Sequence, residues 1–281
     1  MEIHDYNVSK YGPIISVCLE LSDRCKVGCP YCLLEEKRQE VSKERMFDII
    51  RTLNDYGVVR YTIGGGEPLD IPYVYEIGKF VKNLSHNVLL RTSACNYMNF
   101  KIVKESFDLV DISIDSCKKE TMKKCKPNIN SEMVFQNIKN FSENHITYRC
   151  NILITQYNFN DVLPTIMWLA ENGVRDIRIQ KLVRRGKAKE IFTNINVSDD
   201  EYYDLLKEIF ARCSYLNINV TEVKSVNSQT LCIVKPNGEL YVGTSSGIIR
   251  IGEVFNIDDL NEASRLIYSN QKKVYNDIKI E

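Results

Sequence analysis

The segment VVRYTIGGGEPLDIPYVYEIGKFVKNL (58–84) joins an apolar run, a glycine-rich turn and a helical pattern. The run VVRYTI (58–63) predicts a strand, because β-branched and aromatic residues are typical of strands. Beyond the turn, apolar residues recur at the spacing of one helix face: Tyr73, Ile77, Phe80, Val81 and Leu84. The segment therefore predicts one strand–turn–helix unit.

Similar units lie on both sides of this segment. Further strands are predicted at 14–21, 87–92, 109–115, 146–155 and 174–180. Helices are predicted at 40–56, 134–141 and 162–170, and from 199, where Ser198 and Glu201 form a capping box. Strand–helix alternation implies a parallel sheet with right-handed crossovers. Six units are too few for an eight-fold barrel, so the predicted fold is an α/β, partial (β/α)6 TIM-like barrel.

The end of the chain has a different pattern. CIVKPNGELYV (232–242) predicts a β-hairpin around Pro236-Asn237-Gly238, and a short helical tail is predicted from about 257. We therefore expect a barrel over 14–222 and a small hairpin and helix extension over 223–281.

Composition limits the class of protein. Lys plus Arg and Asp plus Glu both total 37, so the net charge of the 281-residue chain is zero. This balance argues against a broad nucleic-acid or membrane-surface footprint. The polar N-terminus lacks a signal-peptide core, and no apolar run approaches the about 18 residues of a membrane span. We expect a cytoplasmic protein whose ten cysteines are mostly reduced, so that clustered ones are metal ligands.

Three cysteines follow the first predicted strand. In LSDRCKVGCPYCLLEEK (21–37), Cys25, Cys29 and Cys32 have the spacing C-x3-C-x2-C. A structural zinc site needs four ligands, so a zinc loop would require a distant fourth one such as His86. Three cysteines on a [4Fe–4S] cube leave one iron free for a small molecule. Both interpretations remain open at this point.

Other polar residues also follow predicted strands. GGGEP comes after the second strand, Ser93 after the third, and Gln180 ends the sixth. Ligands of such sheets bind at the carboxyl ends of the strands. The sequence therefore places these residues and the cysteines on one rim.

The cysteine spacing, with Tyr31 before the third cysteine, resembles the signature of the radical S-adenosylmethionine (SAM) superfamily. The resemblance implies that Cys25, Cys29 and Cys32 hold one [4Fe–4S] cluster that chelates SAM. IGGGEPLD (63–70) resembles the GGEP motif of that family, which implies that Gly65, Gly66, Glu67 and Pro68 form the site for the SAM amino group. A carboxylate is a natural acceptor for an ammonium group.

Further segments share this resemblance less specifically. DISIDS (111–116) resembles the fourth-strand segment, which implies that Ser113 and Asp115 reach the SAM ribose. YRCNILIT (148–155) resembles the fifth strand, and Arg149 is the candidate for the SAM carboxylate. RIQKLVRRGKAKE (178–190) resembles the sixth-strand segment of peptide-modifying members, although its charge run is typical of a solvated loop.

The segment 231–260 resembles the start of a SPASM or twitch extension, but its second cysteine position, near Gly243, is not cysteine. Cys232, even with Cys213, is too few for an auxiliary cluster. We therefore expect a degenerate extension.

The resemblance implies an enzyme that cleaves SAM to a 5′-deoxyadenosyl radical and abstracts a substrate hydrogen, with an electron donor such as flavodoxin or ferredoxin. The favoured substrate is a peptide, and the favoured outcome is redox-neutral, such as epimerisation. Epimerisation needs a thiol that donates a hydrogen, and Cys95 is the leading candidate, ahead of Cys117, Cys150 and Cys232. The alternatives are a small-molecule substrate, such as an aminosugar or a nucleotide handled by a viperin-like dehydratase, and a non-catalytic metal-binding module.

Overall fold

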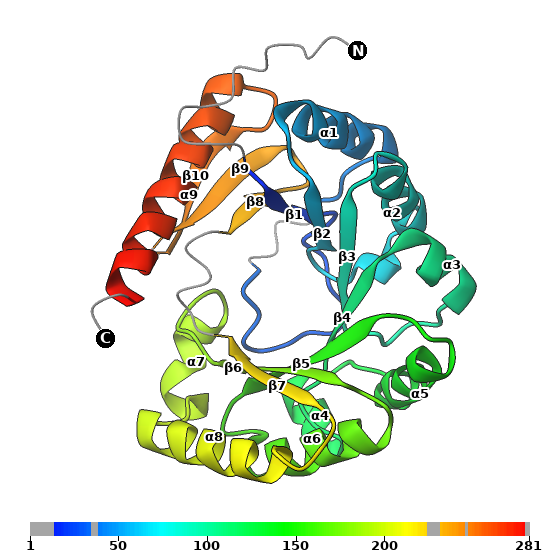
Figure 1. Cartoon of the computed structure of the whole chain (residues 1–281), viewed down its shortest axis with the longest axis vertical. Helices are drawn as coiled ribbons and strands as arrows, with labels where there is room; N and C mark the ends of the chain where they lie inside the picture. Colours follow the sequence, from blue (N-terminus) through cyan, green and yellow to red (C-terminus); the bar gives the residue numbers. More distant parts are fainter. Residues whose placement is uncertain (1–13, 35–38, 224–230, 245–246, 279–281) are drawn as a thin grey trace.

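The computed structural model describes residues 14–34, 39–223, 231–244 and 247–278. Within these residues, ten strands form one sheet in the order β10-β9-β8-β1-β2-β3-β4-β5-β6-β7. The strands β7 and β10 are its two edges, so the sheet curves without closing (Figure 1). The molecule is an α/β partial barrel, as the sequence predicts.

The first seven strands run parallel. The six predicted strands are present, and β7 is an addition that the sequence did not indicate. Its side chains are polar or half-exposed, so it lacks the apolar pattern on which strand prediction depends. The bounds are β1 (Ser16–Glu20), β2 (Arg60–Gly64), β3 (Asn87–Thr92), β4 (Leu109–Ser113), β5 (Tyr148–Ile154), β6 (Asp176–Lys181) and β7 (Asn219–Val223).

Helices cover the outer face of this sheet (Figure 1). They bury apolar stripes such as Val74, Ile77 and Val81 of α2, which packs on β3, where the alternate residues Val88 and Leu90 are buried. The helices are α1 (Lys43–Tyr56), α2 (Val74–Asn83), α3 (Phe100–Ser106), α4 (Lys119–Cys125), α5 (Ser131–Glu143), α6 (Val162–Glu171), α7 (Ala188–Ile195) and α8 (Asp199–Cys213). The predicted capping box begins α8.

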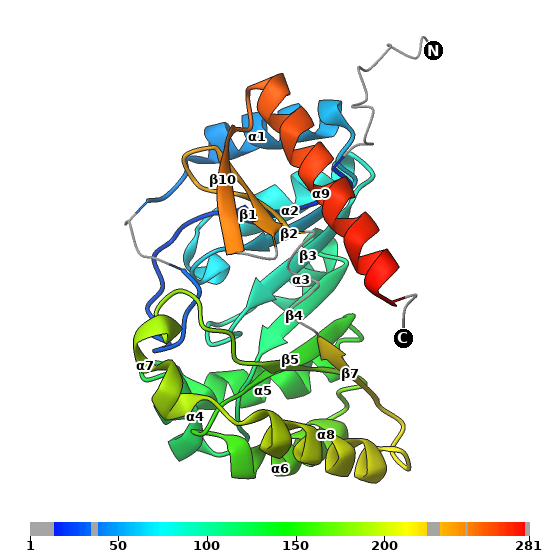
Figure 2. The same cartoon turned by 90° about the vertical axis from the view of Figure 1, so that its left-hand side faces the viewer.

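The C-terminal segment extends the same sheet. The predicted hairpin is formed by β8 (Cys232–Val234) and β9 (Glu239–Thr244), and β8 pairs in parallel with β1. β10 (Gly247–Glu253) follows, and α9 (Ile257–Ile278) packs on β9 and β10 (Figure 2). At 22 residues, α9 is longer than the short tail expected. The pairing of β8 with β1 joins the predicted C-terminal extension (223–281) to the sheet of the predicted barrel (14–222). The division into two domains at 222/223 therefore stays a prediction.

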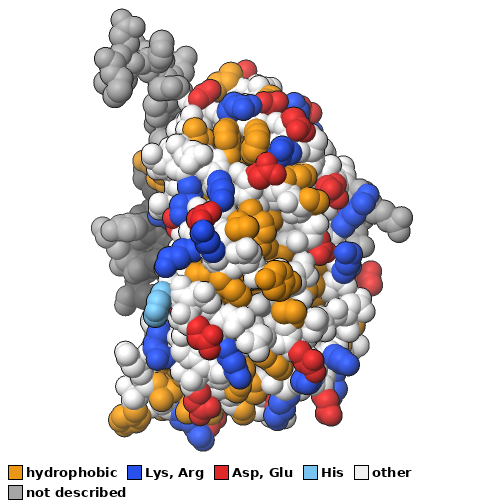
Figure 3. All heavy atoms as spheres, turned by 90° about the vertical axis from the view of Figure 1, so that its right-hand side faces the viewer, with side chains coloured by type: hydrophobic (Ala, Val, Ile, Leu, Met, Phe, Trp, Pro, Cys, Tyr) orange, Lys and Arg blue, Asp and Glu red, His pale blue; other side chains and the backbone are white. Residues whose placement is uncertain are grey.

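On the face shown in Figure 3, Lys and Arg side chains are interspersed with Asp and Glu side chains, in keeping with the zero net charge. In the described part of the chain, no helix combines the length and the apolar character needed to cross a bilayer.

Candidate functional site

The three cysteines lie on the loop that leaves β1. Cys25, Cys29 and Cys32 are half-exposed, and none of them forms a disulfide. Burial raises the pKa of the Cys29 thiol to about 12, and the Lys126 ammonium opposes that rise. The loop thus offers three cysteines outside any disulfide at the carboxyl end of the barrel.

The glycines after β2 pack directly against this loop. The Gly66 N–H donates to the Ser22 carbonyl at 2.7 Å. A Cβ atom on Gly66 would lie 1.7 Å from the Arg24 carbonyl oxygen, and one on Gly65 would lie 2.4 Å from that of Ser22. Because no side chain fits there, these glycines allow the backbone before Cys25 to dock on the end of β2.

The loop after β6 holds the other end of the cysteine loop. The Lys187 N–H donates to the Cys32 carbonyl at 2.9 Å, and a Cβ atom on Gly186 would lie 2.3 Å from that same oxygen. Tyr31 also packs beside Ala188 of α7. The backbone of the segment 178–190 therefore packs on the cysteine loop, while the charged side chains of Arg184, Lys187 and Lys189 are exposed, as the charge run predicts. Sequence reasoning missed this contact, and the only signal was the isolated glycine within the basic run.

Gly186→Ala should release the cysteine loop, because Gly186 has φ +56° and no room for a Cβ atom. We expect reconstituted Gly186→Ala protein to retain much less iron than the parent. The matched control is Gly247→Ala, since Gly247 also has positive φ but has no neighbour within 4 Å of an added Cβ atom. Iron and sulfide analysis after gel filtration measures the effect. Equal iron loss in both variants would show that backbone strain alone is responsible.

The Glu67 carboxylate lies between β2 and β3. It accepts hydrogen bonds from Thr92 Oγ1 (2.5 Å), Ser93 N–H (2.9 Å), Ser93 Oγ (2.5 Å) and Leu69 N–H (3.2 Å). Glu67 is 3 % exposed, and burial raises its pKa although these hydrogen bonds oppose the rise. These contacts fasten the GGGEP turn to β3, and the expected role of Glu67 toward the SAM amino group stays a prediction. Pro68 begins the short 3-10 helix that follows, Pro68–Asp70.

Asp115 is also committed to protein partners. Its Oδ2 accepts from Tyr31 Oη at 2.8 Å and lies 2.9 Å from Lys126 Nζ, and its Oδ1 accepts from Leu153 N–H at 3.2 Å. Asp115 is 1 % exposed. Asp115 and Tyr31 thus link the cysteine loop to β4 and β5, and the place of both residues at a SAM site stays a prediction.

Lys126 is the residue of this cluster that sequence reasoning missed. It is 2 % exposed, and its ammonium donates to the Ser113 carbonyl and Ser113 Oγ, each at 2.8 Å. Burial alone would lower its pKa, but Asp115 and Cys29 raise the pKa above its ordinary value. Its position among other lysines at the end of α4 gave no sign of burial.

Arg149 has a different partner from the expected SAM carboxylate. Its Nε and Nη2 donate to the two carboxylate oxygens of Asp111 at 3.1 and 2.9 Å, and both side chains are buried. Gln180 is half-buried near the end of β6, beside Leu153 of β5. The contacts of Arg149 and Gln180 do not test whether either side chain binds SAM.

The remaining thiols differ in their surroundings. Cys95 is half-buried beside the rim, and its Sγ lies 3.2 Å from Ser93 Oγ. Cys232 is fully buried in β8, and burial raises its pKa to about 12. Cys213 is buried on α8. Cys95 is thus near the Glu67 turn, whereas Cys232 is a core residue.

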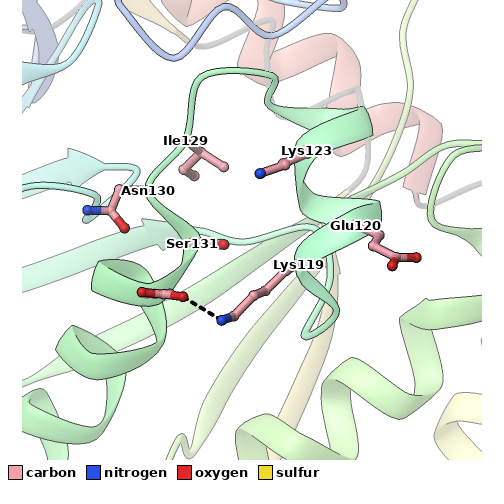
Figure 4. Close-up of a pocket in the computed structure, with 7 residues that line it drawn as sticks. Lys119, Glu120, Lys123, Ile129, Asn130 and Ser131 are labelled. Atoms are coloured by element: carbon pink, nitrogen blue, oxygen red, sulfur yellow. Dashed lines mark hydrogen bonds and ion pairs between the residues drawn. The ribbon is translucent and has the colours of Figure 1, made fainter.

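A separate pocket of about 300 Å³ lies between α4 and the start of α5. Figure 4 shows the Lys119–Glu132 ion pair (2.5 Å) across it, with Lys123 directed toward Ile129. Its charged lining belongs to the exposed side of α4, so this pocket is not part of the candidate site.

The spacing of the three thiols limits the kind of metal centre that they can hold. Among the described residues, no three His, Cys, Asp or Glu side chains converge on a position for one metal ion. In a [4Fe–4S] cube each cysteine binds a different iron, so convergence on one point is not needed. Three half-exposed cysteines outside any disulfide on one loop fit such a cluster in their chemistry.

A partial parallel barrel with three clustered cysteines after its first strand and a glycine–glutamate turn after its second defines a class of enzyme that binds its cofactors on one rim. The family sequence model described as the radical SAM superfamily matches residues 19–169, which is more than half of the chain. The protein therefore belongs to that family. It is therefore an enzyme that uses a [4Fe–4S] cluster and SAM and needs a reductant.

Two curated relatives are similar in sequence. The S-adenosylmethionine-dependent nucleotide dehydratase of Flammeovirga pacifica is 25 % identical over 252 residues, which cover 83 % of this chain and 84 % of the relative. The GTP 3′,8-cyclase of Clostridium perfringens is 24 % identical over 229 residues, covering 71 % and 64 %. The chain thus spans slightly less than two thirds of the cyclase.

Two solved structures share the fold. Streptococcus suis SuiB bound to precursor peptide SuiA has a TM-score of 0.71 at 14 % identity, covering 81 % of this chain and 58 % of SuiB. anSMEcpe with bound AdoMet and a Kp18Cys peptide has a TM-score of 0.70 at 14 % identity, covering 90 % and 82 %. These likenesses establish the barrel architecture.

Proposed function

We propose that this enzyme abstracts a hydrogen atom from a phosphate-bearing small molecule of the nucleotide class. The observation that carries the reaction type is the clamped loop: Cys25, Cys29 and Cys32 are cysteines outside any disulfide, held between the GGGEP turn and Gly186. The nucleotide dehydratase supports the substrate class, because its similarity extends over most of both chains.

When bound to Cys25, Cys29 and Cys32, the cluster supplies the electron that cleaves SAM to methionine and a 5′-deoxyadenosyl radical. The protein's own residues provide placement. Glu67 fixes the GGGEP turn on β3, and the buried Asp115–Lys126 pair fixes Tyr31 beneath the cysteine loop. A rigid rim of this kind keeps the reacting groups in register.

The first test is metal content and SAM cleavage. Anaerobically reconstituted protein should hold about four iron and four sulfide per chain, because one loop carries three clustered cysteines. After reduction with dithionite or flavodoxin, it should convert SAM to 5′-deoxyadenosine. About eight iron would show that the C-terminal extension binds a second cluster. One zinc without iron would favour the non-catalytic module.

The second test concerns the substrate. Nucleoside triphosphates labelled with deuterium on the ribose should transfer the label to 5′-deoxyadenosine. Transfer from a labelled peptide but from no nucleotide would favour the second candidate, a peptide substrate. The specific observation behind that candidate is Cys95, whose half-buried thiol beside Ser93 is suited to return a hydrogen in an epimerisation. Its supporting resemblance is the segment 178–190.

A further inference from the structure

Charged side chains form a row on the inner face of the sheet, opposite the helices. Arg91 of β3 pairs with Asp111 of β4, and Asp111 pairs with Arg149 of β5. Arg178 of β6 pairs with Asn151, two residues further along β5. Residues paired in this way lie on one face of a sheet, so guanidinium groups from three strands share this face.

Asp111 neutralises only part of this charge. Arg149 binds both of its oxygens, Asn151 donates to Oδ1, and Arg91 Nε lies 3.7 Å from Oδ2. Although burial opposes ionisation, Arg149 and Arg91 hold the pKa of Asp111 below its ordinary value. Asp111 is thus a carboxylate held closely by Arg149 and Asn151 and more loosely by Arg91, and no carboxylate forms an ion pair with Arg178 among the residues that the structure describes.

Arg178 is the arginine of this row whose charge is least neutralised. It is half-buried, and its side chain forms no hydrogen bond or ion pair with any residue that the structure describes. Burial and repulsion from Arg149 lower its pKa, while Asp111 and Asp176 oppose this change. A partly desolvated guanidinium is costly without a partner, so a bound anion would stabilise it.

The balance of charge on this face is positive. Arg91, Arg149 and Arg178 face two carboxylates, Asp111 and Asp176. The Arg91 side chain is 55 % exposed, so solutes reach the row from the inner side. On β1, at the level of Arg91, Glu20 is already paired with Lys235 at 2.6 Å.

We propose that Arg91, Arg149 and Arg178 form the site for the substrate's phosphate groups, an assignment that rests on the proposed function. Guanidinium groups bind phosphate oxygens in bidentate fashion, and three of them on adjoining strands suit a group with several charged oxygens better than a single carboxylate. Arg178 supplies the free donors, Arg91 the exposed entry, and the Asp111–Arg149 pair the fixed base of the site.

The probe is inorganic triphosphate, titrated calorimetrically into the cluster-loaded, SAM-bound enzyme without reductant. Arg178→Met and Arg91→Met should each weaken triphosphate binding by about ten- to a hundredfold, as expected for a lost charge-assisted contact. The control is Arg51→Met, because Arg51 lies on α1 at the outer face, paired with Asp48 at 2.7 Å. Arg51→Met should bind triphosphate like the parent.

Several results would overturn this site. The first is that the parent protein binds no triphosphate, and the second is that the arginine variants bind it as tightly as the parent does. The third is displacement of bound triphosphate by a glutamate-rich peptide. A matching loss of SAM affinity in Arg178→Met would also overturn it, because the guanidinium would then serve SAM. Since the titration needs no reductant, it is independent of SAM cleavage. Protein that binds triphosphate but yields no 5′-deoxyadenosine would refute the proposed function and leave the site standing.

Discussion

Replacing any one of Cys25, Cys29 and Cys32 by Ala should reduce the iron content from about four per chain to nearly none, and SAM cleavage should be lost with it. The reason is that the loop has no spare thiol. Cys18, which precedes the loop, is buried in β1, and its pKa is raised by burial to about 11. A cube held by two cysteines has too few protein ligands to persist.

The matched control is Cys232→Ala. Cys232 has 0 % exposure and lies in β8 within the apolar core, so its loss should leave a small cavity and an intact cluster. Iron, sulfide and the visible absorption of the cluster are compared with 5′-deoxyadenosine yield in all four variants. Iron loss in Cys232→Ala would make that thiol a ligand and contradict the degenerate extension expected from the sequence.

Lys126→Met should destabilise the protein by about 3–5 kcal/mol, the usual cost of breaking a buried ion pair by removing one partner. The Asp115 carboxylate would remain 1 % exposed, with only Tyr31 and the Leu153 N–H as partners. Since whole domains are stable by only about 5–15 kcal/mol, this loss should be obvious in urea unfolding. Iron retention should fall as well, because Tyr31 belongs to the cysteine loop.

Lys119→Met is the control on the same helix. Lys119 pairs with Glu132 across the exposed pocket, and such pairs contribute little to stability. A double variant, Lys126→Met with Asp115→Asn, should recover part of the loss, because it removes the unpaired charge. If Lys126→Met unfolds at the same urea concentration as Lys119→Met, the buried pair does not stabilise the fold.

The sequence alone determined the architecture and the order of motifs along the rim. Strands and helices with clear apolar periods, such as β2 and α2, lie where their patterns predict them. The cysteines and the GGGEP turn also follow adjacent parallel strands, as expected from strand–helix alternation. Local periodicity suffices here, because a parallel sheet brings the ends of its strands to one edge.

Only the tertiary structure decided which side chains are partners. Glu67, Asp115 and Arg149 are polar residues at the expected places, yet their charges are already bound by Ser93, Lys126 and Asp111. Lys126 looks like one more surface lysine, and Gly186 like part of a solvated charge run. Their roles depend on contacts with distant segments: Gly186 meets Cys32, and Lys126 meets Asp115 only because β4, β6 and the cysteine loop converge. Sequence periodicity reports which face of an element is buried, whereas the pairing of buried charges is set by strand register and loop docking, which involve residues far apart in the chain.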